Sequence, residues 1–118
     1  MAAHEKIDYV EFPAKDLPAT ERFFCAVFGW TFEQFGPEYI AFTNQGLDGG
    51  FYLSDKVSSA ENGSALIVFY SDDLRETLAK IEQAGGIVLK PIFDFPGGQR
   101  FHFSDPSGNE YAVWANKN

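Results

Sequence analysis

The chain has a single cysteine and few basic side chains. Its 118 residues contain 9 Lys and Arg against 17 Asp and Glu, for a formal net charge of −8. This charge disfavours nucleic acids and anionic membranes as partners and favours neutral or cationic ligands. One cysteine excludes an internal disulfide and a zinc site of paired cysteines. Cys25 lies in an apolar helical stretch, so we expect it to be a small buried side chain.

Long hydrophobic runs are missing too. No apolar stretch approaches the roughly 18 residues that cross a bilayer, and no charged-then-apolar leader opens the sequence, so we expect a cytoplasmic protein. The pairs Gly49-Gly50 and Gly97-Gly98 lack the spacing of a phosphate-binding loop and predict turns or close packing. Aromatic residues, by contrast, make up 17% of the chain, and this content predicts a well-packed globule.

Residues 100–114 show the clearest alternation of apolar and polar side chains. They predict strands at 100–104 and 110–114, joined by a type I turn over 105–108 whose Asp, Pro and Gly are preferred in such turns. Successive side chains of a strand point to opposite faces. The face opposite the core is then expected to hold four residues: His102, Glu110, Ala112 and Trp114.

The arrangement of a strand, a helix and three further strands occurs twice. A helix start at Asp16 recurs at Asp73 and a helix end at Gly29 recurs at Gly86, both 57 residues later. Later strands are offset by 61 residues, and the first strand after the second helix is expected over 87–92. The matching helix starts and helix ends indicate an internal sequence repeat.

The repeat predicts an α+β fold. We expect a single domain, residues 1–118, made of two tandem βαβββ modules at approximately 5–55 and 64–116. In each module the helix covers one face of the sheet and leaves the other face bare. Two bare faces side by side would form an incomplete barrel around a cleft.

Two runs of residues and the modules themselves carry a resemblance to a known family. The run from Lys15-Asp16-Leu17 to Phe28-Gly29-Trp30, and the turn at 105–109, are similar to those of the vicinal oxygen chelate superfamily. This superfamily contains glyoxalase I, extradiol dioxygenases, fosfomycin-resistance transferases and bleomycin-resistance proteins. The resemblance covers nearly the whole chain and implies a glyoxalase/bleomycin-resistance-like fold. It also implies a homodimer, because members commonly dimerise.

The enzymes of that superfamily bind a divalent metal through His, Gln or Glu from the first and last strands of each module. The matching positions in this chain are Tyr9, Phe51, Leu66 and Ala112. Phenol and hydrocarbon side chains do not replace imidazole and carboxylate as ligands of such an ion. We therefore predict neither a cofactor nor the usual metal site, and this departure removes support for the superfamily's enzymatic activities.

A substitute catalytic site is the alternative. Glu11, His102 and Glu110 are all expected to face the cleft, where they could hold a divalent metal, or a buried glutamate could act as general acid or base. Against this, a histidine between two phenylalanines is more often a hydrogen-bonded structural residue. Whether the protein is an enzyme stays open here, with a lyase or dioxygenase-like activity as the candidate.

The cleft is expected to be aromatic and acidic. Such a surface favours an aromatic or cationic organic ligand, through stacking and cation–π contacts. We expect a small-molecule-binding protein of the glyoxalase/bleomycin-resistance type; in a third interpretation its own side chains fill the cleft of an interaction module. The residues predicted to bind the ligand are Tyr9, Glu11, Phe51, Leu66, Tyr70, His102, Glu110 and Trp114.

Overall fold

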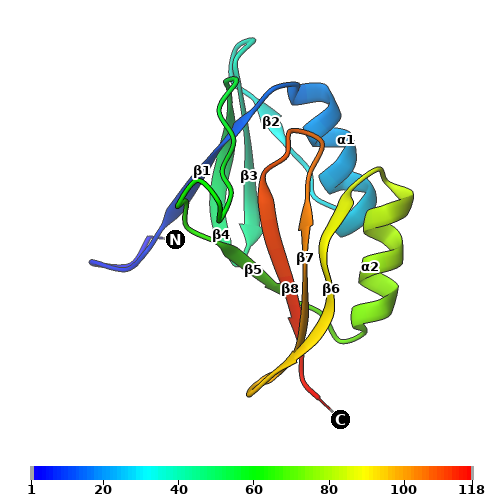
Figure 1. The fold of residues 1–118 in the computed structure, drawn as a ribbon. Coiled ribbons are helices and arrows are strands. Elements are labelled where there is room, and N and C mark those ends of the chain that lie inside the picture. The colour runs from blue at the N-terminus through cyan, green and yellow to red at the C-terminus, as the bar shows by residue number, and fades with distance from the viewer. Residues whose placement is uncertain (1, 118) are drawn as a thin grey trace.

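Each half of the chain builds one four-stranded sheet. The structure, a computed structural model, describes residues 2–117 (Figure 1). The first half forms β1 (Tyr9–Ala14), α1 (Leu17–Phe28), β2 (Glu33–Gln34), β3 (Tyr39–Gln45) and β4 (Leu47–Leu53). The second half forms β5 (Ile67–Tyr70), α2 (Leu74–Gln83), β6 (Ile87–Phe95), β7 (Gly98–Ser104) and β8 (Glu110–Ala115). The predicted α+β class and its two βαβββ modules are confirmed.

The two sheets have the same topology. Their strand orders are β1-β4-β3-β2 and β5-β8-β7-β6, and in each the first strand pairs in parallel with the last. The remaining pairs are antiparallel. The sheets are not joined to each other by strand pairing among residues 2–117, so the barrel is not closed.

Capping residues set the ends of both helices. Asp16 accepts a hydrogen bond from the Ala19 N–H at 3.0 Å, and Asp73 accepts one from the Glu76 N–H at 3.1 Å. α1 ends at Gly29, whose φ of 71° lies in the left-handed region that glycine tolerates. Neither helix within residues 2–117 is long and apolar enough to cross a membrane.

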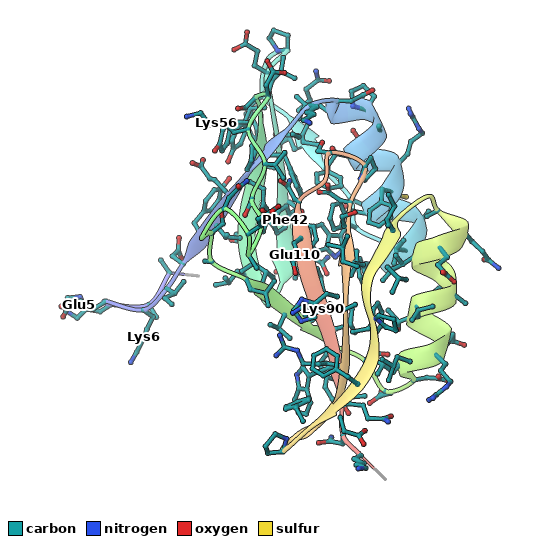
Figure 2. The ribbon with its side chains drawn as sticks, viewed as in Figure 1. Glu5, Lys6, Phe42, Lys56, Lys90 and Glu110 are labelled. Carbon is teal, nitrogen blue, oxygen red and sulfur yellow. The ribbon has the colours of Figure 1, made fainter. Side chains whose placement is uncertain are left out.

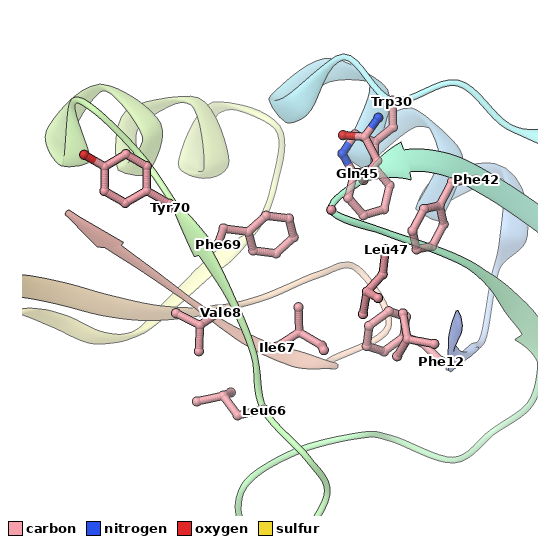
Figure 3. Close-up of a pocket in the computed structure, with 12 residues that line it drawn as sticks. Phe12, Trp30, Phe42, Gln45, Leu47, Leu66, Ile67, Val68, Phe69 and Tyr70 are labelled. Carbon is pink, nitrogen blue, oxygen red and sulfur yellow. The ribbon is translucent and has the colours of Figure 1, made fainter. Parts of the chain in front are cut away.

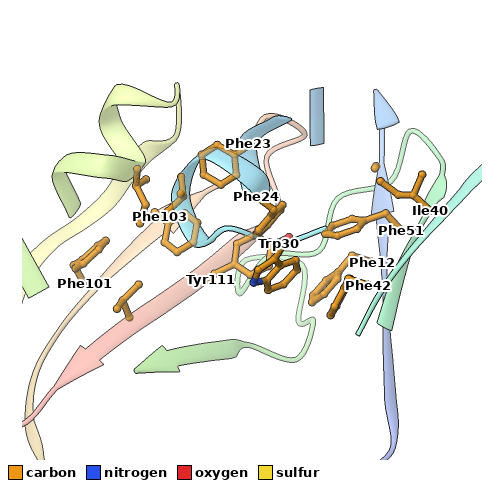
Figure 4. Close-up of a cluster of buried hydrophobic side chains, with 14 of the residues drawn as sticks. Phe12, Phe23, Phe24, Trp30, Ile40, Phe42, Phe51, Phe101, Phe103 and Tyr111 are labelled. Carbon is orange, nitrogen blue, oxygen red and sulfur yellow. The ribbon is translucent and has the colours of Figure 1, made fainter. Parts of the chain in front are cut away.

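One aromatic core lies between the helices and both sheets (Figure 4). The ring of Phe24 on α1 stacks on Trp30 at 4.7 Å and contacts Tyr111 of β8 at 5.6 Å. Phe28, at the end of the same helix, stacks on Phe69 of β5 at 4.5 Å. Burying each ring contributes about 1.5–3 kcal/mol. The modules therefore share a core on the helix side, while the opposite face of each sheet is left without a helix.

The turn between β7 and β8 ties the second module to the first. Its Asp105 carboxylate accepts hydrogen bonds from the Asn109 N–H at 3.1 Å and from the Tyr111 hydroxyl at 2.7 Å. Asn109 in turn donates its side-chain amide to the Pro13 carbonyl at 2.6 Å and accepts from the Ser58 N–H at 2.9 Å. Burial raises the pKa of Asp105, although these hydrogen bonds favour its charged form. The turn is thus a structural link between modules.

The structure corrects the expectation for Cys25. This residue is exposed on α1 rather than buried. The buried residues of α1 are Leu17, Thr20, Phe23, Phe24 and Val27. Cys25 follows Phe24 by about 100° around the helix and so points away from the core.

Candidate functional site

A buried polar network lies on the bare face of the second sheet, between β7 and β8. His102 and Glu110 are 4% and 9% exposed, and the His102 Nδ1 lies 2.8 Å from the Glu110 Oε2. The second oxygen of Glu110 accepts a hydrogen bond from the Ala60 N–H at 3.0 Å. Arg100, on the same face of β7, places its Nη2 2.8 Å and its Nε 3.3 Å from the His102 Nε2. Glu110 and the nearby Lys90 of β6 are marked in Figure 2.

The hydrogen-bond donors of this network show where its protons lie. A guanidinium only donates hydrogen bonds, so the Nε2 of His102 is the acceptor and the ring proton sits on Nδ1, where it is donated to Glu110. Burial disfavours the charge on Glu110, but the hydrogen bonds from His102 and Ala60, together with nearby charges, outweigh it and lower the pKa of Glu110. His102 therefore links the Arg100 cation to the Glu110 anion.

Aromatic rings surround the Arg100 guanidinium. Its Cζ lies 5.7 Å from the ring centre of Phe93 and 5.8 Å from that of Phe95, both on β6. Trp114 is the cross-strand neighbour of Arg100 on β8 and contacts Phe95 at 6.2 Å. An open recess of about 270 Å³ lies beside these rings. It is lined by Val68, Phe95, Gly97, Arg100 and Trp114. We call this hollow the Arg100 recess.

A second polar group lies on the bare face of the first sheet. The Tyr39 hydroxyl donates to the Glu11 Oε2 at 3.0 Å and lies 2.6 Å from the Tyr9 hydroxyl. Burial, followed by the hydrogen bonds with Tyr9 and Glu11, raises the pKa of Tyr39. The phenol lies directly over Gly50, where a Cβ would overlap the hydroxyl oxygen. Gly50 thus leaves the space that Tyr39 fills.

A hollow larger than the Arg100 recess lies between the modules. It has a volume of about 570 Å³, and Figure 3 shows Phe12, Trp30 and Phe42 of the first half on one side and β5 on the other. Leu66 and Tyr70 border it on the β5 side. Volume and lining are in the range of small-molecule sites, which are about 300–1,000 Å³ and mostly apolar. We call it the inter-module hollow.

The positions of this chain that match the metal ligands of the superfamily's enzymes are not suited to bind a metal ion. Tyr9 bonds to Tyr39, Leu66 borders the inter-module hollow, and Ala112 is fully buried between its strand neighbours. The substitute trio is not assembled either: among residues 2–117, no three His, Cys, Asp or Glu side chains are grouped so that they could hold a metal ion. Glu11 instead belongs to the first sheet's phenol group. No catalytic step through a metal follows from these residues.

Phe51 was expected on the cleft side, and this orientation is wrong. Its ring is fully buried in the shared core, where it stacks on Phe12 at 5.2 Å. Ile40 pairs with Phe51, whereas its repeat counterpart Phe101 pairs with Val113, so the last strands are offset by 62 residues rather than 61. The counterpart of Ala112 is therefore Gly50, which offers no metal ligand either.

The other predicted ligand residues fall into three places. Tyr9 and Glu11 lie on the first sheet, and His102, Glu110 and Trp114 lie on the second. Leu66 and Tyr70 border the inter-module hollow, and the half-exposed Tyr70 ring also packs on Trp114 at 5.0 Å. Their role in binding stays a prediction.

Sequence reasoning missed three residues of the second sheet's bare face: Phe93, Phe95 and Arg100. Arg100 precedes His102 by two residues, so the alternation that placed His102 on this face could also have placed Arg100 there. The two phenylalanines were missed because the strand was expected to end at residue 92, whereas β6 continues to Phe95. Pro91 made the earlier end plausible, since proline removes a ladder donor.

These features define a class of two-module α+β proteins whose paired sheets share one core and carry ligand-sized hollows. Residues 6–113 match the model of the glyoxalase/bleomycin resistance protein/dioxygenase superfamily. The chain belongs to this superfamily, as its sequence motifs indicated.

Similar proteins include both enzymes and binding proteins. A glyoxylase-like domain-containing protein of Didymella fabae is 29% identical over 126 residues, which cover 96% of this chain and 95% of that protein. A glyoxalase-related enzyme from Fulvimarina pelagi superimposes with a TM-score of 0.79 and 21% identity, covering 95% of this chain and 88% of its own. TnmS3, an antibiotic binding protein from Streptomyces sp. CB03234, has a TM-score of 0.69 and 18% identity, covering 99% and 100%. At these identities the two structures show the fold.

Proposed function

We propose that this protein binds an aromatic organic small molecule in the inter-module hollow, without the divalent metal of the superfamily's enzymes. The observation that carries the proposal is the hollow itself, about 570 Å³ with walls of aromatic and aliphatic side chains. A flat apolar ligand there would pack against Trp30 and Phe42 and displace water from the more exposed Val68 and Tyr70, gaining about 25 cal/mol per Å² of apolar surface buried. Similarity to an antibiotic binding protein supports a binding role.

The charge of the ligand is a separate part of the proposal. The net charge of −8 favours a cationic aromatic molecule over an anionic one. A positive charge against an aromatic ring of the hollow, such as Trp30 or Tyr70, would also gain about 0.5–2 kcal/mol from cation–π contact. We therefore expect a cationic aromatic ligand to bind the inter-module hollow at least as well as its neutral isostere.

A homodimer is proposed alongside this function. Apolar side chains are exposed on both bare faces, among them Tyr9 at 44% and Val68 at 42%. Pairing of the first face with the same face of a partner would cover Tyr9 and leave the Arg100 recess on the second face open. Dimerisation stays a prediction, as does a cytoplasmic location, and sedimentation equilibrium measures the former.

Intrinsic fluorescence tests binding in the inter-module hollow. The chain has two tryptophans, so Trp114→Phe leaves Trp30 as the single indole and a reporter inside the hollow. Titration with 2-naphthamide, an uncharged two-ring probe, is expected to change the Trp30 emission saturably. Leu66→Phe, which fills the hollow from its β5 side, should weaken this binding about tenfold.

The matched control is Leu53→Phe, the same substitution at an exposed residue that does not line the hollow. This variant should bind 2-naphthamide with the affinity of the parent. An unchanged Trp30 signal throughout the titration, or equal weakening by both substitutions, would overturn the proposal. Replacing the probe by 2-naphthylmethylammonium tests the preference for a cation.

A further inference from the structure

Arg100 is a cation that lacks a carboxylate partner. No Asp or Glu within residues 2–117 forms an ion pair with its guanidinium, although 17 acidic residues are present in the chain. Its contacts to protein acceptors converge on one atom, the His102 Nε2. A guanidinium has five N–H donors, and one ring nitrogen cannot accept all of them. Donors on the outer side of Arg100 are therefore left for another acceptor.

The network behind Arg100 holds the guanidinium in place. His102 accepts from two of its nitrogens and is itself fixed by the 2.8 Å contact between its Nδ1 and Glu110. Glu110 is anchored by the main-chain N–H of Ala60. These contacts reduce the conformational entropy that Arg100 would lose on binding a ligand. A preorganised guanidinium is suited to bind a carboxylate through two parallel hydrogen bonds.

The surroundings of Arg100 select for a flat apolar group beside the anion. Phe95, Trp114 and Val68 form the walls of the recess, and the guanidinium lies against the rings of Phe93 and Phe95. The recess, about 270 Å³, is just below the usual size of drug-like sites, so it fits one or two fused rings. Aromatic pairs of this kind contribute about 0.5–1.5 kcal/mol beyond area burial.

From these observations we propose that the Arg100 recess is a second binding site, which takes the carboxylate of a small aromatic acid. The carboxylate binds the outer donors of Arg100, and the ring packs on Trp114 and Phe95. This preference opposes the net charge of −8, but direct contact decides it, because distant surface charges are screened over about 8–10 Å at physiological salt. The site lies outside the inter-module hollow, with Val68 as their shared wall residue.

Calorimetric titration with an isosteric pair of probes tests this site. The Leu66→Phe protein, in which the inter-module hollow is filled, is expected to bind 2-naphthoate about tenfold more tightly than 2-naphthamide. Arg100→Gln should abolish this difference, while Arg75→Gln makes the same substitution at an exposed residue of α2, outside the recess and its network, and should change naphthoate affinity less than about threefold.

Three outcomes overturn the proposal: equal affinity for the two probes, equal loss in the Arg100 and Arg75 variants, or no naphthoate binding. The comparison of the two probes needs no substitution at Arg100, so it stays decisive if Arg100→Gln fails to fold. Failure here is distinguishable from failure of the proposed function, because the inter-module hollow is tested separately through Trp30 with the uncharged probe.

Discussion

His102 is a buried histidine whose two ring nitrogens both contact charged side chains. The expectation that a histidine flanked by phenylalanines is hydrogen-bonded rather than free agrees with this geometry, in which Glu110 and Arg100 occupy both nitrogens. With both nitrogens engaged, the neutral ring has no lone pair left to accept a proton from a substrate. We therefore assign His102 the role of holding Arg100 in position.

Glu110 gives the network a measurable dependence on pH. Its pKa is lowered from an ordinary value of 4.5, so its charge contributes stability that is present above pH 4.5 and is lost as the pH falls through the lower folded-state pKa. Glu110→Gln should therefore destabilise the protein at pH 7. Urea unfolding should show the gap between wild type and variant shrinking as the pH is lowered toward 3.

The control for this prediction is Glu61→Gln, at an exposed residue of the loop before β5. Its stability should follow that of wild type across the same pH range. A gap for Glu110→Gln that is as large at pH 3 as at pH 7 would show that the carboxylate charge contributes nothing to stability.

At the scale of elements, the close approach of β1 and β4 depends on two adjacent glycines. A Cβ on Gly49 would overlap the main-chain carbonyl of Val10 and the ring of Phe42. On Gly50 the three atoms nearest to it would all belong to the Tyr39 phenol, the movable end of a side chain. Gly49→Ala should therefore cost about 1–3 kcal/mol of unfolding free energy, and Gly50→Ala clearly less. The two glycines pack closely, as their sequence context indicated.

Thermal and urea unfolding of the two alanine variants measure this difference. Each serves as the other's control, because they share the substitution, the strand and the loss of a glycine. A variant order opposite to the expected one would mean that β1 and β4 shift apart more easily than Tyr39 moves aside.

Sequence periodicity predicted most of the elements, but not every register. Caps at Asp16 and Asp73 placed both helices, since a capping carboxylate is a local signal. The side of Phe51 was wrong because the segment between the paired residues Phe103 and Tyr111 is one residue longer than the segment between their counterparts Phe42 and Gly49. A shift of one residue moves a side chain to the opposite face. This one-residue difference is visible only in the pairing of the strands, and the sequence of either module does not show it.

At the scale of the whole molecule, the shared core determines where ligands could bind. Both helices and one face of each sheet are used for the core, so the bare faces and the gap between modules remain. Sequence alternation placed Glu11, His102 and Glu110 on these faces but put Phe51 on the wrong side. It also did not predict that Glu11 and His102 belong to separate groups. The two groups are separate because of how the two sheets pack. Alternation within a strand shows which side a residue faces, but not where one sheet lies relative to the other.

The central claim is that an aromatic ligand binds this protein without a divalent metal. Calorimetric titration of the full-length protein with 2-naphthamide in EDTA, repeated after saturation with Mn²⁺, Ni²⁺ and Zn²⁺ in turn, tests it most directly. The account predicts the same affinity in all four conditions and no stoichiometric heat when each metal is added alone. Ligand binding that appears only after a metal is added, or a metal bound one to one with micromolar affinity, would contradict it.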